Sequence, residues 1–563
     1  MVPATPATIR RVGLALALTG LAGACAPAAP GTAPQPTAPT VALAEAESAY
    51  ADLYALRDRI AITIGAGAAA SPEGVPLSTL TRRRDSLRIR LEPRLAAIDS
   101  MALTGEDQRA LGEMRHALAT SLAPDPTPST AVDSGPPVCV YDPRALAVGQ
   151  RGVEALRNRM YACYGWARNH LLLDGKRTDA RETFDALTRE EDPARRRRLF
   201  LALEPVWRAV DGKGGADSPY RTALRLDPKD GELPASGAAR ALGIPPDSLE
   251  AWLRRILETW RAGTADTLIE PWDWYYVVGR ANRRLGTLIP RPRLDSLNTS
   301  VFRALGADPV ALHVHYDLAP REGKDPVAST DFGARARRID GRWTPAEPWV
   351  VATYETGGLD NLNELLHETG HAVHIAAIRT RPAFSDWPDS DPFTEGLGDF
   401  VALDVFEPAW QLRWLGDSVP LADGLRARYA GIVFDIAWAL FETRMRRDPT
   451  QDPNRVWAGI TGEYFRIRAH PGLSWWAMRG QLVNAPGYMM NYAIGAIVIA
   501  AIRARTTEVH GPFVTGDSTW YGWIAPRLYR WGLERSSRQV VTEFLGGPVT
   551  PAAILADMRR MRP

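Results

Sequence analysis

A short stretch of this 563-residue chain holds two histidines and an acidic residue at a spacing that suits a metal ion. It reads His367-Glu368-Thr-Gly-His371. On a helix, residues four apart lie on one face, about 6 Å apart along the axis, so both imidazoles can point at one ion. Glu368 is rotated by about 100° from His367 and can reach a water molecule beside that ion. The spacing therefore predicts a metal site at which Glu368 acts as the general base.

The surrounding sequence favours a helix for this stretch. Leu362, Leu365, Leu366 and Val373 recur at helical spacing and supply an apolar face. The five residues match the H-E-x-x-H pattern of zinc peptidases. The alternative is that these histidines and glutamates lie on ordinary surface helices without a metal. That alternative does not account for three of the nine histidines falling within eight residues.

A third metal ligand is expected at the start of the next helix. Asp391 is a suitable N-cap and is followed by a proline, which suits the first helical position. Glu395 then lies one turn into this helix, and Asp399 falls on the same face. Gly396 and Gly398 each cost up to about 1 kcal/mol of helix stability. We therefore expect another helix, the one with the histidines, to approach closely here.

Two histidines and Glu395 would bind one Zn²⁺ and leave a fourth position for water, as in catalytic rather than structural zinc sites. Asp399 would accept a hydrogen bond from a ring N–H of a ligand histidine, which we expect to be His371. His374, one helical turn further on, is interpreted as a packing residue.

The segment HETGH, followed after 24 residues by EGLGD, resembles the angiotensin-converting-enzyme (peptidyl-dipeptidase A) family of zinc metallopeptidases. The thimet-oligopeptidase-like family is a near second. The resemblance covers most of residues 41–563, but only the zinc segment is specific. It implies a mostly α fold, a large helical two-lobed clamshell with a deep central cleft. It also implies zinc-dependent hydrolysis of short peptides. A lipid-anchored binding protein on a catalytically retired version of this fold is the rival hypothesis.

Both families supply a tyrosine from their C-terminal region to stabilise the oxyanion, and the resemblance assigns this role to Tyr488 or Tyr492. Tyr488 is the first choice, and packing tyrosines are the alternative. Counting back by the converting-enzyme spacing, Arg479 replaces the lysine that holds the substrate carboxylate. Gln481 replaces a histidine of that family. Arg479 and Gln481 are thus the expected substrate-binding residues, but these departures favour simple cleavage of short peptides over strict dipeptide release from the C-terminus.

The N-terminus has the composition of an export signal. Arg10-Arg11 precede an apolar run too short to span a membrane, and the run ends in small residues before Cys25. This resembles the lipobox of bacterial lipoproteins, although the usual leucine is Ala22 here. Residues 1–24 are then a signal peptide, Cys25 is lipidated, and 25–40 form a Pro/Ala-rich linker. The expected location is a membrane anchor on the periplasmic or cell-surface side, with plain secretion as the alternative.

The chain has three cysteines in all, and in an oxidising compartment Cys139 and Cys163 are a candidate disulfide. Two buried free thiols are the alternative. The balance of 67 basic and 65 acidic residues gives a net charge of +2 and no electrostatic case for nucleic acid. We expect a monomer whose partners are short peptides and, through the anchor, a lipid membrane.

Helical periodicity dominates from residue 41 onward, so residues 41–563 are expected to form one mostly α body. His313–Asp317 and Trp349–Tyr354 alternate like strands and are expected to form a small ribbon. The Pro/Ser/Thr-rich segment 121–138 marks a possible N-terminal helical subregion, 41–138. The expected helices are Leu43–Ile62, Leu80–Ile98, Thr178–Val210, Ser248–Gly263, Pro292–Leu305, Leu359–Ile378, Asp391–Phe406, Asp423–Arg446, Asn454–Ile467 and Gly487–Arg505.

Overall fold

The computed structural model describes residues 39–122, 137, 139, 141, 150–227, 235–264, 267–321, 324 and 327–562. The predicted signal peptide, Cys25, all but the end of the linker and nearly all of segment 121–138 lie outside these residues. Among the helices of the described residues, none is long and apolar enough to cross a membrane.

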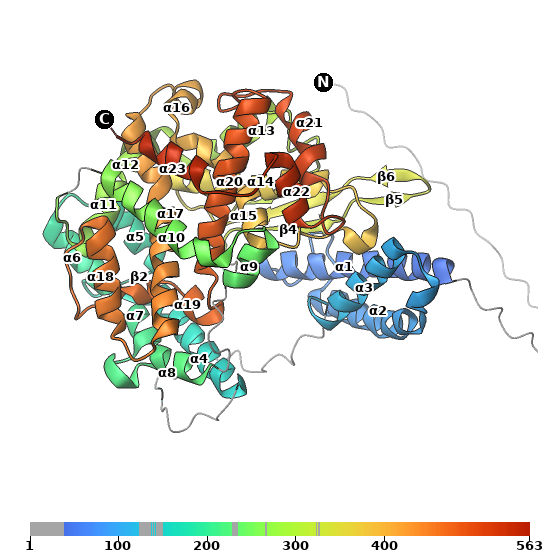
Figure 1. Cartoon of the computed structure of the whole chain (residues 1–563), viewed down its shortest axis with the longest axis horizontal. Coiled ribbons are helices and arrows are strands. Elements are labelled where there is room, and N and C mark those ends of the chain that lie inside the picture. The colour runs from blue at the N-terminus through green and yellow to red at the C-terminus, as the bar shows by residue number, and fades with distance from the viewer. Residues whose placement is uncertain are drawn as a thin grey trace, which may run out of the picture.

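The chain is mostly α-helical, as the sequence predicts, and its helices gather in two lobes (Figure 1). The N-terminal helices are α1 (Pro39–Gly65), α2 (Leu77–Ala97) and α3 (Gly105–Ala119). The middle of the chain forms α4 (Gln150–Asn169), α5 (Ala180–Arg189), α6 (Pro193–Ala202), α7 (Glu204–Asp211), α8 (Pro219–Leu226), α9 (Ala235–Ala241), α10 (Pro246–Gly263), α11 (Trp274–Val278), α12 (Arg280–Leu285) and α13 (Leu294–Ala304).

The C-terminal part of the chain forms the remaining helices. They are α14 (Leu359–Ala377), α15 (Asp391–Ala402), α16 (Pro408–Leu415), α17 (Leu421–Arg447), α18 (Pro453–Phe465), α19 (Gln481–Asn484), α20 (Met489–Val509), α21 (Trp520–Ile524), α22 (Ser537–Leu545) and α23 (Ala552–Arg559). Helix α15 packs between α14 and α20 near the middle of the molecule (Figure 1).

One expected helix, Thr178–Val210, is wrong as a single element because prolines divide it. It forms α5, α6 and α7, and Pro193 is the first residue of α6, capped by the Asp192 side chain. Pro205 lies in the first turn of α7, where its missing N–H costs no hydrogen bond. The apolar periodicity continues across these breaks, so it did not reveal them.

The two expected strands do pair. In the mixed sheet, β7 (Glu347–Val351) lies between β3 (His315–Asp317), which runs parallel to it, and β4 (Ser329–Ala334), which runs antiparallel. The pairs β1 (Leu171–Leu173) with β2 (Lys176–Thr178) and β5 (Arg337–Ile339) with β6 (Arg342–Thr344) form two hairpins. Strand β4 was not predicted. Its sequence, Ser-Thr-Asp-Phe-Gly-Ala, does not alternate, and it ends in a bulge at Gly333.

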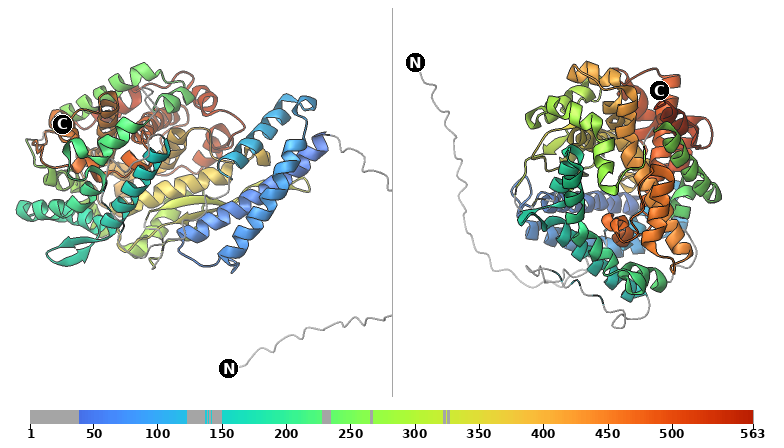
Figure 2. Two further views of the ribbon diagram at one scale, coloured as in Figure 1. Left: turned by 90° about the horizontal axis from the view of Figure 1, so that it is seen from below. Right: turned by 90° about the vertical axis from the view of Figure 1, so that its left-hand side faces the viewer.

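Helices α1 to α3 pack around a cluster of apolar side chains of their own, to which the segment before α15 adds Ala383 and Phe384. Seen from below, α1 lies along the sheet and α2 lies beside α1 (Figure 2). Their attachment to the sheet is polar: Arg335, buried just after β4, forms ion pairs with Asp58 of α1 and with Asp386. Cys139 and Cys163 are joined in a disulfide, which ties the chain before α4 to that helix.

Candidate metal centre

Helix α14 presents His367 and His371 on one side because its other side is apolar and buried in the core. The four apolar residues that predict this helix are all buried there: Leu362, Leu365, Leu366 and Val373. The Nε2 atoms of the two histidines lie 3.0 Å apart. Each ring therefore turns the same nitrogen toward a common point.

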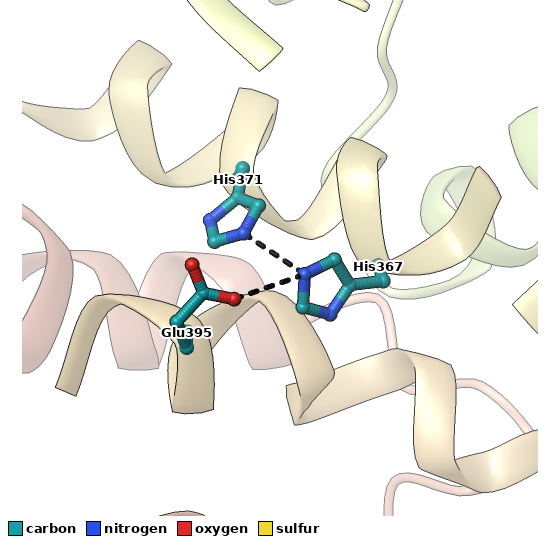
Figure 3. A group of neighbouring side chains, drawn as sticks. All are labelled: His367, His371 and Glu395. Carbon is teal, nitrogen blue, oxygen red and sulfur yellow. Dashed lines mark hydrogen bonds and ion pairs between the residues drawn. The ribbon is translucent and has the colours of Figure 1, made fainter. Parts of the chain in front are cut away.

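Helix α15 brings Glu395 to the same point, and the three side chains converge in Figure 3. Glu395 Oε2 lies 3.6 Å from His367 Nε2, and one ligand atom from each of the three residues lies within 4.8 Å of the others. The N-cap is Ser390, whose hydroxyl accepts from the Phe393 N–H, and not Asp391 as expected. This shift by one residue leaves Glu395 one turn into the helix.

The approach of α15 to α14 depends on glycine. A Cβ at Gly398 would lie 2.8 Å from both His367 Cε1 and His371 Nε2, and one at Gly370 would lie 2.4 Å from the Gly398 carbonyl oxygen. Real Cβ atoms do not come this close. The predicted close approach of the histidine helix is thus confirmed at Gly398. Gly396 instead faces α20, where a Cβ would lie 3.2 Å from the Gly495 carbonyl oxygen.

These donors fit zinc. A tetrahedral Zn²⁺ with nitrogen ligands at about 2.0–2.1 Å places them roughly 3.3 Å apart, close to the distances that separate His367 Nε2 from the other two ligand atoms. Two neutral imidazoles and one carboxylate form a donor set that zinc accepts, with one position left over. We conclude that His367, His371 and Glu395 would hold the ion.

Asp399 orients one of the two histidines, but not the one expected. His367 Nδ1 donates to Asp399 Oδ1 over 2.8 Å, whereas the Nδ1 atom of His371 is buried with no partner among the described residues. Asp399 follows Glu395 by one turn and so meets the histidine nearer the start of α14. The proton on Nδ1 leaves the lone pair of His367 Nε2 free for a metal. Burial lowers the pKa of His367. The nearby carboxylates of Asp399, Glu395 and Glu368 have the larger effect and raise this pKa well above 6.5.

Glu368 is buried beside the triad and is held by a residue that the sequence did not single out. Thr330, in β4, donates its hydroxyl to Glu368 Oε2 over 2.6 Å and also contacts the Glu368 backbone oxygen at 2.9 Å. Burial raises the pKa of Glu368 above its ordinary value, and His367 opposes this shift. No sequence signal pointed to Thr330, because its strand lacks an alternating pattern.

The triad opens into a cavity of about 580 Å³. Residues of β4, α14, α15 and α20 line this cavity, which is open to solvent. The polar residues of the lining are Ser329, Thr330, Glu364, His367, Glu368, His371, Asp391, Thr394, Glu395, Asp399 and Tyr492. His374 faces elsewhere. It is fully buried against Trp387 and Tyr529, as its interpretation as a packing residue requires.

Of the two candidate tyrosines, Tyr492 lines the cavity. The Tyr488 ring packs edge-on against the Tyr492 ring, with 5.2 Å between the ring centroids. Burial raises the pKa of both hydroxyls, and the Glu395 carboxylate adds to the effect. Both hydroxyls therefore stay protonated at neutral pH and keep a proton to donate near Glu395.

Helix α17 holds the segment before these tyrosines through three residues on one helical face. Asp435 pairs with Arg479, and the Trp438 ring N–H donates to the Trp476 backbone oxygen. Glu442, one turn further, accepts from the Gly487 N–H over 2.6 Å, immediately before Tyr488. No motif identified Glu442, because its partner is a backbone group 45 residues away.

Burial raises the pKa of Glu442 from 4.5 to about 7. Arg446, the Gly487 N–H and Arg157 oppose the shift. The Glu442 carboxyl group thus accepts a hydrogen bond from the residue before Tyr488 at a buried position, where a negative charge is poorly solvated.

A second cavity, of about 440 Å³, contains the expected substrate-binding residues. Gln481 lines it and lowers the pKa of the Tyr492 hydroxyl, and the Tyr492 side chain lines the first cavity. Arg479 lines it too, but its guanidinium is paired with Asp435 and stacks on Trp438. Arg168, also in the lining, has no carboxylate partner among the described residues. The remaining walls are largely aromatic: Tyr164, Phe184, Trp274, Tyr275, Phe434 and Trp438.

Comparison with known proteins gives a fold. No protein-family model and no curated protein sequence matches the chain. Solved structures do match over almost the whole length. The M32 carboxypeptidase of Deinococcus radiodurans R1 is 13% identical, with a TM-score of 0.53, over 93% of this chain and 98% of its own. The chain has a metallocarboxypeptidase fold.

Two further structures share this fold. Metallocarboxypeptidase 1 of Trypanosoma cruzi (13% identity, TM-score 0.51) covers 92% of this chain and 99% of its own. The Pyrococcus furiosus carboxypeptidase structure (13% identity, TM-score 0.52) covers 93% and 99%. They support the zinc metallopeptidase fold that the resemblance implies. They do not single out the converting-enzyme or thimet-oligopeptidase families.

Gly398→Ala should weaken zinc binding. The added Cβ would overlap both imidazole rings, so α15 must move away from α14 and take Glu395 with it. We expect zinc affinity, measured by competition with a chromophoric chelator, to fall about tenfold or more. Gly431→Ala in α17 is the matched control, because a Cβ there meets nothing within 4 Å. Equal zinc affinity in Gly398→Ala and the wild type would contradict the close approach.

Glu442→Gln should stabilise the zinc-free protein at high pH only. In the wild type, the raised pKa means that folding disfavours the charged carboxylate, so stability is lost as the pH rises from about 4.5 to about 7. The amide is neutral throughout and can still accept from Gly487. The melting temperature of the variant should therefore exceed that of the wild type at about pH 8, and the difference should vanish near pH 4. A difference that does not depend on pH would rule out this titration.

Proposed function

We propose that this chain is a zinc metallopeptidase that hydrolyses short peptides near their C-termini. The observation that carries the proposal is the convergence of His367, His371 and Glu395 beside a buried Glu368, in an open cavity. The fold supports it, because the matching structures are carboxypeptidases by name. A retired binding protein would have no use for a general base poised next to three zinc donors.

The residues of the cavity divide the work of hydrolysis. Bound at the triad, zinc would polarise the scissile carbonyl and lower the pKa of a water molecule. Glu368 accepts the proton of that water and passes it to the leaving amine. Its raised pKa suits both steps, and the Thr330 hydroxyl fixes the direction of the carboxylate. Asp399 keeps His367 in the tautomer that turns Nε2 to the ion.

A tyrosine hydroxyl would donate to the oxyanion that forms during attack. Tyr492 is better placed than the first choice, Tyr488, because its side chain lines the cavity. Gln481 acts on the Tyr492 hydroxyl by lowering its pKa, and Tyr488 packs against the Tyr492 ring edge-on.

The second cavity favours release of more than one residue. Asp360 lines it and lies seven residues before His367 on α14, about 10 Å along the helix axis. An extended peptide advances about 3.4 Å per residue. A substrate carboxylate bound there by Arg168 would lie two to three residues from the scissile bond. Arg479 adds positive charge beside it, although Asp435 already pairs with that guanidinium.

Carboxypeptidase action on single residues is the second candidate, favoured by the names of the matching structures. A thimet-oligopeptidase-like enzyme is the third, and it would not need a free C-terminus. Mass spectrometry of a mixed peptide pool decides among them. Dipeptides or tripeptides released only from free C-termini support the proposal, single amino acids support the carboxypeptidase, and equal cleavage of C-terminally amidated peptides supports the oligopeptidase. No chelator-sensitive cleavage at all by the zinc-loaded protein would refute the peptidase assignment.

Glu368→Gln should keep zinc and lose activity by several orders of magnitude, since it removes the base but no metal ligand. The measurement pairs metal analysis with turnover of a quenched peptide. His371→Ala is the contrasting variant and should lose zinc itself. Glu368→Gln protein with normal turnover would refute the assigned base.

Tyr492→Phe should lower kcat by roughly 10²-fold while zinc content stays unchanged, because it removes a donor to the oxyanion. Tyr488→Phe is the matched control and should have the smaller effect if it only supports the neighbouring ring. The reverse order would return the role to Tyr488, and an effect on KM alone would make either residue a substrate-positioning group.

A further inference from the structure

Helix α2 is far more basic than the chain as a whole. It contains six arginines and two acidic residues in 21 positions, a formal charge of +4, whereas all 563 residues sum to +2. The rest of the chain therefore sums to −2. Helix α6 carries the same +4, so the charge alone does not mark a binding surface, and the partners of the α2 arginines decide.

Half of these arginines are paired within the protein. Arg84 binds Asp85, Arg88 binds Glu92, and Arg94 binds Glu45 of α1. These pairs use every acidic residue of the helix.

The other three arginines have no carboxylate partner among the described residues. Arg82 and Arg90 reach only the hydroxyls of Thr79 and Ser86, and Arg83 contacts no polar group. All three side chains are exposed. Arg83 and Arg90 are seven residues apart and share a helical face, and Arg82 lies about 100° around the helix from Arg83. All three line the same groove.

The same side is hollowed and partly apolar. A groove of about 400 Å³ runs between α1 and α2, with half-buried Leu56 and Leu87 between the arginines. Ile89 lies beside it, 66% exposed. Apolar side chains among guanidiniums are the composition of helices that lie in a membrane interface, where the charges meet phosphates and the apolar groups enter the acyl boundary.

We propose that this face of α2 binds the anionic headgroups of a phospholipid membrane. Charge complementarity selects the occupant, since three unpaired guanidiniums match a surface of phosphates. Position supports it. Cys25, the predicted acylation site, precedes the first residue of α1 by 14 residues, which bounds its distance from Pro39 to about 50 Å. An acyl chain and a basic patch together give the two signals that stable anchoring takes. The inference does not depend on peptidase activity.

Vesicle binding tests the proposal on the full chain carrying Cys25→Ser, so that no acyl group contributes. Vesicles of phosphatidylcholine alone measure any contribution of the N-terminal leader. We expect stronger binding to vesicles that contain phosphatidylglycerol, and weaker binding as salt rises. Replacing Arg82, Arg83 and Arg90 together by Gln should lower the partition coefficient by roughly 100-fold, or about fivefold for each arginine.

The matched control replaces Arg195, Arg197 and Arg198 of α6 by Gln, which removes the same charge at another exposed helix. It should bind like the parent chain, and circular dichroism should show both triple variants to be folded. Ile89→Ser should weaken binding further only if the apolar groups enter the bilayer. Two results would overturn the proposal: equal losses in the two triple variants, or competition by inorganic phosphate beyond that of chloride at equal ionic strength, which would indicate a site for free phosphate.

Discussion

The close approach of α14 and α15 is the constraint on which the site depends. At Gly370 and Gly398 the two backbones come so near that no side chain fits between them. This contact, rather than any single ligand, sets the distance from Glu395 to the two imidazoles. A Cβ at either glycine would separate the helices, whereas loss of one ligand would leave the other two in place. The helical cost of one glycine in each helix, Gly370 in α14 and Gly398 in α15, is thus offset by a metal-binding geometry that residues with side chains would not allow.

Two further elements, strand β4 and helix α17, complete the site around this contact. Strand β4 brings Thr330 to Glu368, and α17 fixes the tyrosine segment by bonding to Arg479, to the Trp476 backbone and to the Gly487 N–H. The side chains proposed to act in catalysis come from the facing sides of α14 and α15 and from the start of α20. The supporting residues are spread over much more of the chain. At 13% identity the chain can share this fold with the matching structures because only three residues would hold the metal and most of the others need only pack.

The sequence predicted what depends on local spacing. The pair His367 and His371, the helix that bears them, and Glu395 one turn into the next helix follow from periodicities of four residues and from capping. Prediction from the sequence failed where the contact depends on how one helix is rotated against another. Asp399 was assigned to His371 and bonds to His367, because which histidine it meets is set by the crossing of α14 and α15 and not by either sequence. Thr330 and Glu442 were missed for a similar reason, since their partners lie 38 and 45 residues away. The breaks before α6 and α7 were within reach, because prolines mark both.

The N-terminal helices connect the proposed membrane face to the catalytic groups. Arg335 is buried between Asp58 of α1 and Asp386, which lies five residues before the start of α15, and it directly follows the strand that bears Thr330. A buried guanidinium with two carboxylates is costly to separate, because removing either partner leaves charge without solvation. Helix α1, on which α2 packs, is therefore fixed beside β4 by polar contacts of defined geometry in addition to the apolar cluster around Phe384. With α2 on a membrane, as proposed, the ion pairs of Arg335 set the position of this helix relative to the opening of the metal cavity. The direction from which peptides reach the site is then determined by the fold rather than by the linker before α1.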